Sequence, residues 1–395
     1  MSALFDPELA TQAYIDSLGP EALAKAAAYT AGAHWLTLWE LLVSALITLL
    51  IVRMGVLEKV SSKVPEHRHW LNALLTSVVF SFVYSLLNLP WEYVSEFLRE
   101  TRYGRTSQPA GDWLQQAVLS IGTSVTFGSL FFSGLYWFIR RTGRGWWLWA
   151  SGFTMAMAGL MLILSPTFIE PLFNDYTAVP KGEVRNALEA MADEAGIERE
   201  RIFMYDGSRQ SNNFTANVSG LGSAARIAIS DVAIDRALLD EVKAVTGHEI
   251  GHYVLGHVWR MLFALSALAL LSFFLIDRFF DCFARLFGSK ARLSDPAGLP
   301  VFLFMLGLVF TLVQPVTNGV IRAGENAADQ YSLETVNLPD ALAGALVKTA
   351  EYRYPRPSPL QEMLFYSHPS VEKRVRRAME WKQNHTKNQA ENSNE

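Results

Sequence analysis

Apolar residues are gathered along this chain in blocks longer than most helices of a soluble core. A helix needs roughly 20 residues to cross a bilayer core about 30 Å thick. Six stretches are apolar over that length: 35–56, 70–98, 113–139, 146–169, 258–280 and 299–321. The clearest of them contains Met261–Ile276, which carries no charged residue. The pattern predicts a membrane protein that crosses the bilayer six times.

Two parts of the chain are polar enough to fold in water, residues 170–257 and 322–382. In the first part, helical spacing precedes three short strand-like runs and a second helical pattern. These elements are expected at 184–195, 201–205, 214–218, 226–230 and 236–257. Their order predicts a small α+β unit inserted between the fourth and fifth membrane helices.

The two ends complete the domain organisation. The first residues are acidic and lack the positive stretch of a cleaved signal peptide, whereas the last are polar, which is typical of disorder. The predicted parts are an N-terminal interfacial or amphipathic segment (1–34), four membrane helices (35–169), the α+β insert (170–257), a membrane hairpin of two helices (258–321), a second polar part (322–382) and a disordered tail (383–395).

Composition supports a membrane protein. Of the 395 residues, 50% are hydrophobic and 18% charged, below the roughly 25% charged residues of a typical soluble domain. The net charge of −4 gives no reason to expect nucleic acid as a partner. The single cysteine, Cys282, excludes an internal disulfide. The lipid bilayer is therefore the expected partner, and composition leaves the oligomeric state open.

The last predicted helix of the insert contains the sequence His-Glu-Ile-Gly-His at 248–252. Histidines four residues apart lie on one helical face, so His248 and His252 can bind the same Zn²⁺. Glu249 lies beside that face and can act as the general base that deprotonates the attacking water. The alternative, two unrelated surface histidines, is much less favoured by this spacing.

A catalytic zinc needs a third protein ligand and an open position. His252 lies just before the fifth membrane helix and Glu325 just after the sixth, so two crossings return the chain to the same face of the membrane. We therefore expect Glu325 to be the third ligand, with Glu334 and Glu351 as the next candidates. His257 lies only five residues after His252 and is interpreted as a helix-end or interface histidine.

Two charged residues flank Glu325 at one-turn spacing. Asp329 could hold a ligand histidine by its second ring nitrogen, and Arg322 could pair with either carboxylate. A solvated helix face with alternating charges is the alternative interpretation of this pattern.

These motifs resemble those of the type I CAAX prenyl proteases, integral-membrane gluzincin metalloproteases. The resemblance rests on HEIGHYVLGH at 248–257 and an R-x-x-E-x-x-x-D helix after a membrane hairpin, and it covers about residues 7–380. Shorter matches are Glu170–Asn174, Ser211-Asn212 and Ser367–Pro369. It implies a multi-pass α-helical membrane protein with an inserted α+β zincin-like catalytic domain.

The resemblance also implies roles for individual residues. One Zn²⁺ per chain would bind His248, His252 and Glu325, with Glu249 as the general base. His368 would face the metal and donate a hydrogen bond to the oxyanion of the reaction.

For the substrate, the resemblance implies an edge strand that begins near Asn212 and includes Phe214, to which a peptide adds as a further β-strand. Family members also enclose a water-filled chamber, which would explain Glu40, Glu92 and Glu96 in or beside apolar spans.

Several features favour a bacterial relative over a eukaryotic one. The chain has six predicted spans where eukaryotic members have seven, Asn213 replaces an alanine, and the C-terminus lacks the lysines of a retrieval signal. A bacterial inner membrane is therefore favoured, with the endoplasmic reticulum membrane as the alternative.

The leading functional hypothesis is a zinc endopeptidase that cleaves near the C-terminus of prenylated CaaX-type or other membrane-associated proteins and peptides. A quality-control protease of a bacterial inner membrane is the alternative within this class. A transporter or chamber protein with a structural zinc is the alternative from another class. A structural zinc normally has four ligands and no use for Glu249.

Loop charges and the resemblance disagree on orientation. The short loop at 99–112, on the catalytic side, holds three basic residues, whereas the opposite loops hold nine: Lys59, Lys63, Arg68, Arg140, Arg141, Arg144, Arg285, Lys290 and Arg292. The positive-inside rule would place the active site outside. The resemblance places it in the cytosol, and we follow the resemblance.

Overall fold

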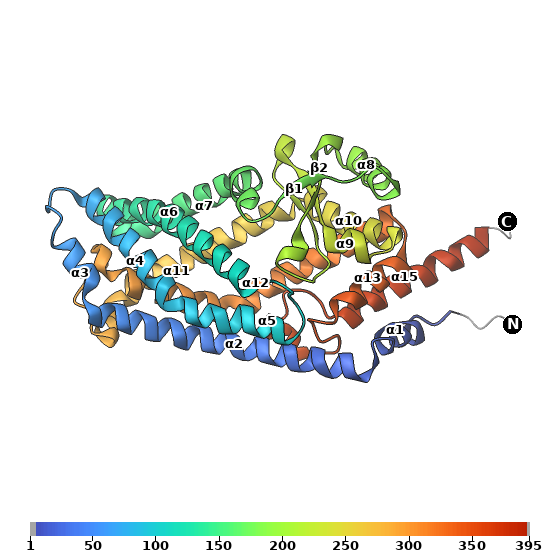
Figure 1. Ribbon diagram of the computed structural model, residues 1–395, viewed down its shortest axis with the longest axis horizontal. Coiled ribbons are helices and arrows are strands. Elements are labelled where there is room, and N and C mark those ends of the chain that lie inside the picture. Colours follow the sequence, from blue (N-terminus) through green and yellow to red (C-terminus); the bar gives the residue numbers. More distant parts are fainter. Residues whose placement is uncertain (1–4, 393–395) are drawn as a thin grey trace.

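The computed structural model describes residues 5–392 of the chain. Long helices form one end of an elongated molecule, and a small sheet with shorter helices forms the other (Figure 1). Both ends of the described chain lie at the end that carries the sheet.

Five helical segments are long and apolar enough to cross a membrane: Gly19–Met54, His69–Arg102, Ala110–Leu172, His257–Phe287 and Pro296–Thr335. The third segment contains two of the six predicted stretches, as α6 (Ala110–Thr142) and α7 (Trp146–Leu164). A Cβ on Gly134 of α6 would lie 2.6 Å from the Phe153 ring of α7, so the two helices fold back on each other. The chain is thus a multi-pass membrane protein.

The remaining long helices are α2 (Gly19–Met54), α4 (His69–Glu92), α11 (His257–Phe287) and α12 (Leu299–Thr335). Short elements between them are α3 (Val56–Ser61), the π-helical turn η1 (Tyr93–Leu98) and α5 (Arg99–Arg102). Their shared core is rich in aromatic side chains, among them Phe80, Tyr136, Trp146, Phe280 and Phe302.

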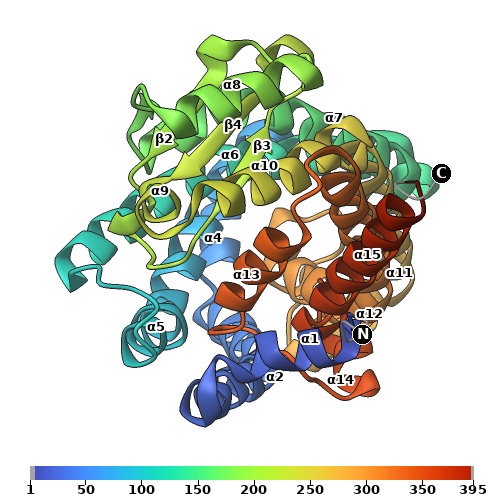
Figure 2. The same cartoon turned by 90° about the vertical axis from the view of Figure 1, so that its right-hand side faces the viewer.

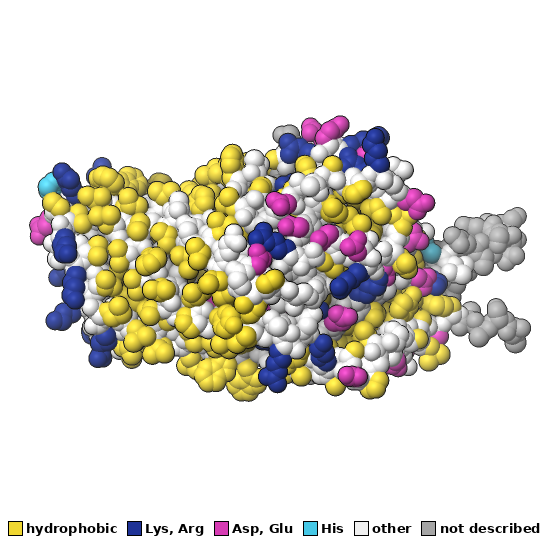
Figure 3. Space-filling model, viewed as in Figure 1, with side chains coloured by type: hydrophobic (Ala, Val, Ile, Leu, Met, Phe, Trp, Pro, Cys, Tyr) yellow, Lys and Arg dark blue, Asp and Glu magenta, His cyan; other side chains and the backbone are white. Residues whose placement is uncertain are grey.

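The outer surface of the long helices is apolar. One face of α2 exposes large apolar side chains at helical spacing, Trp35, Trp39, Leu42 and Leu46, while Ile47 and Ile51 are buried. On the face shown in Figure 3, apolar side chains cover the helical part between a group of Lys and Arg at its tip and mixed charges at the other end. This distribution matches a surface in contact with lipid.

Three carboxylates of the membrane helices face inward. Glu40, Glu92 and Glu96 line a cavity of about 300 Å³ between α2, α4, η1 and α12. A cavity is therefore present where the resemblance implied a chamber, and its lining places these carboxylates together, as expected for charged side chains in membrane helices.

The inserted part contains a four-stranded sheet. Its strands are β1 (Tyr176–Ala178), β2 (Ile202–Tyr205), β3 (Ala216–Ser219) and β4 (Arg226–Ser230), in the order β1-β2-β4-β3. β2 and β4 are parallel and the other pairs antiparallel. Helices α8 (Glu183–Ala195), α9 (Asp231–Arg236) and α10 (Leu239–Val254) accompany the sheet, and β3 is an edge strand.

The last part of the chain returns to the same end of the molecule. It contains α13 (Pro339–Thr349), α14 (Pro359–Phe365) and α15 (Val371–Asn392). Helix α1 (Pro7–Asp16) packs against α13 and α15, with Ile15, Leu342, Val375 and Met379 in their common core (Figure 2).

Some predicted boundaries need correction. Those at 34/35 and 321/322 fall inside α2 and α12, because hydropathy marks where a helix enters the bilayer and not where the helix begins. Helix α15 begins at Val371 and continues through residues 383–392, where we expected a disordered tail. The His385 ring stacks on Trp381 one turn earlier, which supports this extension. Residues 393–395 of the expected tail lie outside the described residues.

Candidate metal centre

Two glycines bring the helices of the site together. A Cβ on Gly251 of α10 would lie 3.1–3.2 Å from atoms of Tyr331 and Ala328 on α12. A Cβ on Gly247 would lie 2.5 Å from Val336. A Cβ at either position would force its neighbours on α12 and at Val336 to shift, so the two glycines favour the close approach that brings the histidines of α10 to Glu325.

The three predicted ligands converge in space. The Nε2 atoms of His248 and His252 are 3.1 Å apart, and they lie 3.4 and 3.3 Å from the two carboxylate oxygens of Glu325. Metal bonds of about 2.0–2.1 Å in a tetrahedral shell separate neighbouring ligand atoms by about 3.3–3.4 Å. Glu325 Oε2 is buried and has no hydrogen-bond partner. The donor set and spacing therefore fit one metal ion.

Each ligand histidine is oriented through its second ring nitrogen. His248 Nδ1 lies 2.9 Å from Asp329 Oδ1, and His252 Nδ1 lies 2.9 Å from Nδ1 of His257. These contacts leave both Nε2 atoms directed toward Glu325. His257 is the first residue of α11 and buried, so it is at a helix end as expected, and it also positions a ligand histidine.

Arg374 is a central residue of the site that the sequence analysis missed. Its guanidinium forms a bidentate ion pair with Asp329, with distances of 2.7 and 2.6 Å, and also lies 3.6 Å from Glu325 Oε2. Both partners of the bidentate pair are almost fully buried. Arg374 lies among four basic residues between 373 and 377, a pattern that by itself indicates a solvated helix face.

The electrostatics of the site favour a cation between the ligands. Burial alone would lower the pKa of His248, but the neighbouring carboxylates of Asp329 and Glu325 raise that pKa to about 9. A proton or a metal ion is therefore stabilised at this position. Burial raises the pKa of the Glu249 carboxyl group.

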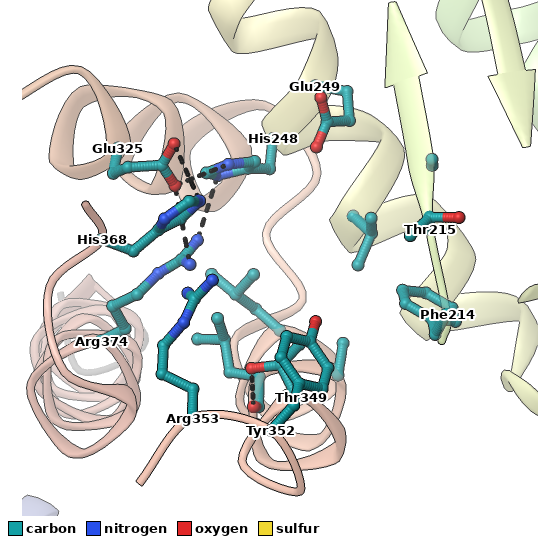
Figure 4. A pocket seen from close by; sticks show the side chains of 15 residues that line it. Phe214, Thr215, His248, Glu249, Glu325, Thr349, Tyr352, Arg353, His368 and Arg374 are labelled. Atoms are coloured by element: carbon teal, nitrogen blue, oxygen red, sulfur yellow. Dashed lines mark hydrogen bonds and ion pairs between the residues drawn. The ribbon is translucent and has the colours of Figure 1, made fainter. Parts of the chain in front are cut away.

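Glu249 and His368 face a cavity of about 230 Å³ that adjoins the ligands (Figure 4). One wall is formed by Phe214 and Thr215, which precede β3, and by Ala216, its first residue, and the other wall is α13 and the loop after it. His368 Nε2 lies 3.3 Å from Glu325 Oε1. Burial, aided by the neighbouring Arg353 cation, lowers the pKa of His368 to about 3, so its ring is neutral at pH 7.

Arg322 has different contacts from those predicted. Arg322 donates to the backbone oxygens of Glu362 and Tyr366, at 3.0 and 2.5 Å, and does not pair with Glu325 or Asp329. Its partners are instead the carbonyl of Glu362 within α14, which also accepts the Tyr366 N–H, and the carbonyl of Tyr366, the residue directly after α14. This contact corrects the predicted ion pair.

Asn212 is tied to the loop before α6. Its amide nitrogen donates to Gly104 O and Ser107 Oγ, both at 3.1 Å, and it is not among the side chains that line the cavity. Phe214 does line that cavity. Asn212 thus attaches the segment before the edge strand β3 to the loop before α6. Of the two residues, only Phe214 lines the cavity beside the metal ligands.

A second and larger cavity reaches the metal ligands from the membrane side. It has about 710 Å³ and lies between α7, α11 and the end of β3. Its lining is mainly apolar, with Met161, Leu162, Val258, Met261 and Leu265, and it includes His252 and Glu325. The metal centre is thus open to both a peptide-sized groove and an apolar space between membrane helices.

The fold and the site together define an integral-membrane metalloprotease with an HExxH motif and a glutamate as third ligand. Residues 178–382 match peptidase family M48, and residues 8–175 match the CAAX prenyl protease N-terminal region, described as five membrane helices. The chain belongs to peptidase family M48. Within the described part of 8–175 we find four long helices, α2, α4, α6 and α7, one fewer than that description.

Relatives and a solved structure agree with this assignment. The chain is 29% identical over 305 residues to the uncharacterized metalloprotease YhfN of Bacillus subtilis, covering 76% of this chain and 71% of the relative. It is 26% identical over 340 residues to CAAX prenyl protease 1 of Saccharomyces cerevisiae, covering 79% and 74%. The crystal structure of S. mikatae Ste24p has the same fold, with a TM-score of 0.71, 22% identity and 92% and 90% coverage.

Proposed function

We propose that this protein is a zinc endopeptidase that binds one Zn²⁺ per chain and cleaves extended, membrane-associated peptides. The observation that carries the proposal is the spacing of the three ligand atoms, with Glu249 and a groove beside them. When bound, the ion supplies Lewis-acid chemistry and lowers the pKa of water. His248, His252 and Glu325 would hold it.

The residues around the ion have distinct tasks in this proposal. Glu249 accepts the proton of the attacking water and later passes it to the leaving amine. His368, as a neutral ring with one N–H, donates to the oxygen on which negative charge develops. Asp329 and His257 keep the ligand rings in place, and Arg374 stabilises Asp329.

The substrate class follows from the two cavities. The groove between β3 and α13 accommodates an extended chain, while the apolar cavity between α7 and α11 suits an aliphatic anchor such as a prenyl chain. Prenylated CaaX-type proteins and other membrane-associated peptides are therefore the proposed substrates. Several relatives carry the name CAAX prenyl protease 1, which supports this class.

For location, we propose a bacterial inner membrane with the catalytic part in the cytoplasm. The match to a Bacillus subtilis metalloprotease supports a bacterial setting. A role in membrane-protein quality control remains a second candidate, because an edge strand recognises backbone groups and demands little of the sequence.

The proposal is tested by separating metal binding from catalysis. Glu249→Gln should retain one zinc per chain but lose peptide cleavage, because the amide fills the same space and cannot accept a proton. His248→Ala and Glu325→Ala should lose zinc, whereas Glu334→Ala, on the exposed side of α12, should retain zinc and activity. Elemental analysis and a fluorogenic peptide assay measure both properties. Normal turnover by Glu249→Gln would overturn the proposed function.

A further inference from the structure

Arg353 is a cation of the catalytic groove that forms no ion pair with the residues whose side chains the structure describes. It lies in the loop after α13, and its side chain extends into the groove toward His368 and Arg374 (Figure 4). Figure 4 draws no hydrogen bond or ion pair between its guanidinium and the other groove residues. The neighbouring arginines differ, because Arg374 is paired with Asp329 and Arg356 with Glu372 and Asp16.

The surroundings make an unpaired cation costly at this position. Burial lowers the pKa of Arg353, and the Arg374 cation lowers it further. A buried charge is normally stabilised by a partner of opposite sign. The nearest acidic residue in sequence, Glu351, does not supply one, because it is 66% exposed and pairs with Arg105 at 3.2 Å.

The charge of the metal-loaded site points the same way. Arg353, Arg374 and a divalent ion face three carboxylates, those of Glu249, Glu325 and Asp329. One positive charge is left over. An anionic group of a bound substrate would balance it at Arg353, the one of the two arginines that is free to form a new ion pair.

The loop that carries Arg353 is held in place by contacts of its two preceding residues with Arg105. The Arg105 guanidinium lies 4.3 Å from the centroid of the Tyr352 ring, and Arg105 also pairs with Glu351. The residues directly before Arg353 are thus fixed to the loop before α6. A cation presented from a fixed backbone loses little entropy when it binds an anion.

The wall between the metal ligands and this loop is aliphatic. Val245, Leu342, Ala345 and Leu346 line the groove on that side. A chain lying along β3 with its scissile bond at Glu249 would place aliphatic side chains against this wall before it reaches Arg353. The groove therefore combines apolar contacts with a single cation.

We propose that Arg353 is a carboxylate subsite, whose guanidinium binds a carboxylate of the substrate a few residues from the scissile bond. The carboxylate is either the free C-terminus of the peptide or an acidic side chain. This inference rests on the peptidase function proposed above and names part of its substrate. It requires that Arg353 increase the affinity for substrates that carry the carboxylate. Substrates that lack the carboxylate should bind with an affinity that does not depend on Arg353.

The experiment uses three peptides that differ only at the C-terminal end: a free acid, a C-terminal amide, and an amide with Glu as its last residue. Binding is measured by fluorescence anisotropy on zinc-loaded full-length protein carrying Glu249→Gln, so that nothing is cleaved. KM and kcat are measured on the otherwise wild-type protein. Arg353→Gln is compared with Arg356→Gln, a control in the same loop that points away from the groove.

We expect Arg353→Gln to weaken binding of the free acid about 10- to 100-fold, the usual effect of losing a hydrogen-bonded ion pair. KM should rise correspondingly with little change in kcat, and the amide should bind equally weakly to both proteins. Arg353→Lys should recover part of the affinity. Arg356→Gln should not alter the preference for the acid. Tight binding of the Glu-ended amide would identify a side-chain carboxylate as the source.

Equal losses for acid and amide would overturn the proposal, because they indicate a structural role or a role at the oxyanion. So would an unchanged preference in Arg353→Gln. If that variant does not fold, wild-type protein that binds all three peptides equally overturns the proposal. In each case wild-type cleavage of the peptides would continue, whereas failure of the proposed function would appear as no zinc-dependent cleavage of any peptide.

Discussion

At the residue scale, the site depends on a buried chain of charges behind the metal ligands. His248 contacts Asp329, and Asp329 is held in turn by both arms of the Arg374 guanidinium. Each charged group therefore has a partner of opposite charge or a hydrogen-bond partner in the next one, and the metal ion would bind at the other end of this chain, at Nε2 of His248. Removing one member leaves a buried group of one charge without its partner.

Arg374→Met should therefore destabilise the protein by about 3–5 kcal/mol, the usual cost of breaking a buried ion pair from one side. It should also weaken zinc binding by about 10- to 100-fold, because Asp329 no longer holds the His248 ring rigidly. Thermal unfolding in detergent and competition with a zinc chelator measure the two effects.

Arg377→Met is the matched control for this prediction. Arg377 lies on the same helix and donates to Asn326 of α12, so it makes a contact between the same two helices with a neutral acceptor. We expect a loss of only about 1 kcal/mol and unchanged zinc affinity. Equal effects of the two substitutions would show that the Arg374–Asp329 pair has no special role.

The ligands could be predicted from sequence because their geometry is local or topological. The spacing of His248 and His252 is a property of one helix, and Glu325 follows from counting two membrane crossings. Arg374 and Arg353 could not be found in this way, since they reach the site from helices and loops whose positions depend on tertiary packing. Arg322 was given the wrong partner because backbone oxygens in and directly after α14, far along the chain, accept its hydrogen bonds instead.

At the element scale, long apolar helices were predicted well and short strands less well. All six apolar stretches are helical, because about 20 apolar residues leave few alternatives. β1 was missed, since Tyr176–Ala178 has only three residues and is mostly exposed, which gives no alternating pattern. β3 was predicted two residues early, and the structure places it at the edge of the sheet.

The register of β3 shows which of its backbone groups are free. Ser230 N donates to Thr215 O, so residues 215 and 230 form a hydrogen-bonded pair, and Ala216 and Ile229 form the next, non-bonded pair. The N–H and C=O of Ala216 therefore point away from β4, toward the groove. The N–H of Thr215 instead faces Ser230 Oγ at 3.3 Å, so a proline at 215 would not test the outer edge.

Ala216→Pro should depress peptide cleavage at least tenfold while leaving zinc content unchanged, because it removes the outward N–H that a bound strand would use. Proline is tolerated on an edge strand when the missing N–H is the unpaired one. Ala216→Gly keeps that N–H and should retain most activity. Full activity of Ala216→Pro with a range of peptides would argue against binding along this edge.

At the scale of the whole molecule, the two walls of the groove are linked by the loop before α6. Arg105 O accepts a hydrogen bond from Asn212 N at 2.8 Å, next to β3, while the Arg105 side chain pairs with Glu351 on the opposite wall. Asp112, in the first turn of α6, adds an ion pair with Arg209 next to this loop. The loop thus joins both walls, and the groove between them has only about 230 Å³.

This arrangement limits which substrates can reach the metal. A peptide bond must be presented as an extended strand between β3 and α13, and a folded domain cannot present one without local unfolding. The second approach, through the cavity between α7 and α11, opens among membrane helices and favours chains held at the bilayer. Selection should therefore depend on flexibility and membrane attachment more than on side chains.

We accordingly predict that one small protein, presented in two forms, is cleaved only when it is unfolded. A permanently unfolded variant should be cut by the zinc-loaded wild-type protein, whereas the folded parent should not. Attaching the unfolded form to liposomes that contain the protease should raise the rate further, because attachment increases its concentration at the membrane. Gel electrophoresis of timed samples measures all three rates, with Glu249→Gln as the inactive control. Equal cleavage of the folded and unfolded forms would mean that the groove opens far more widely than its two bridged walls allow.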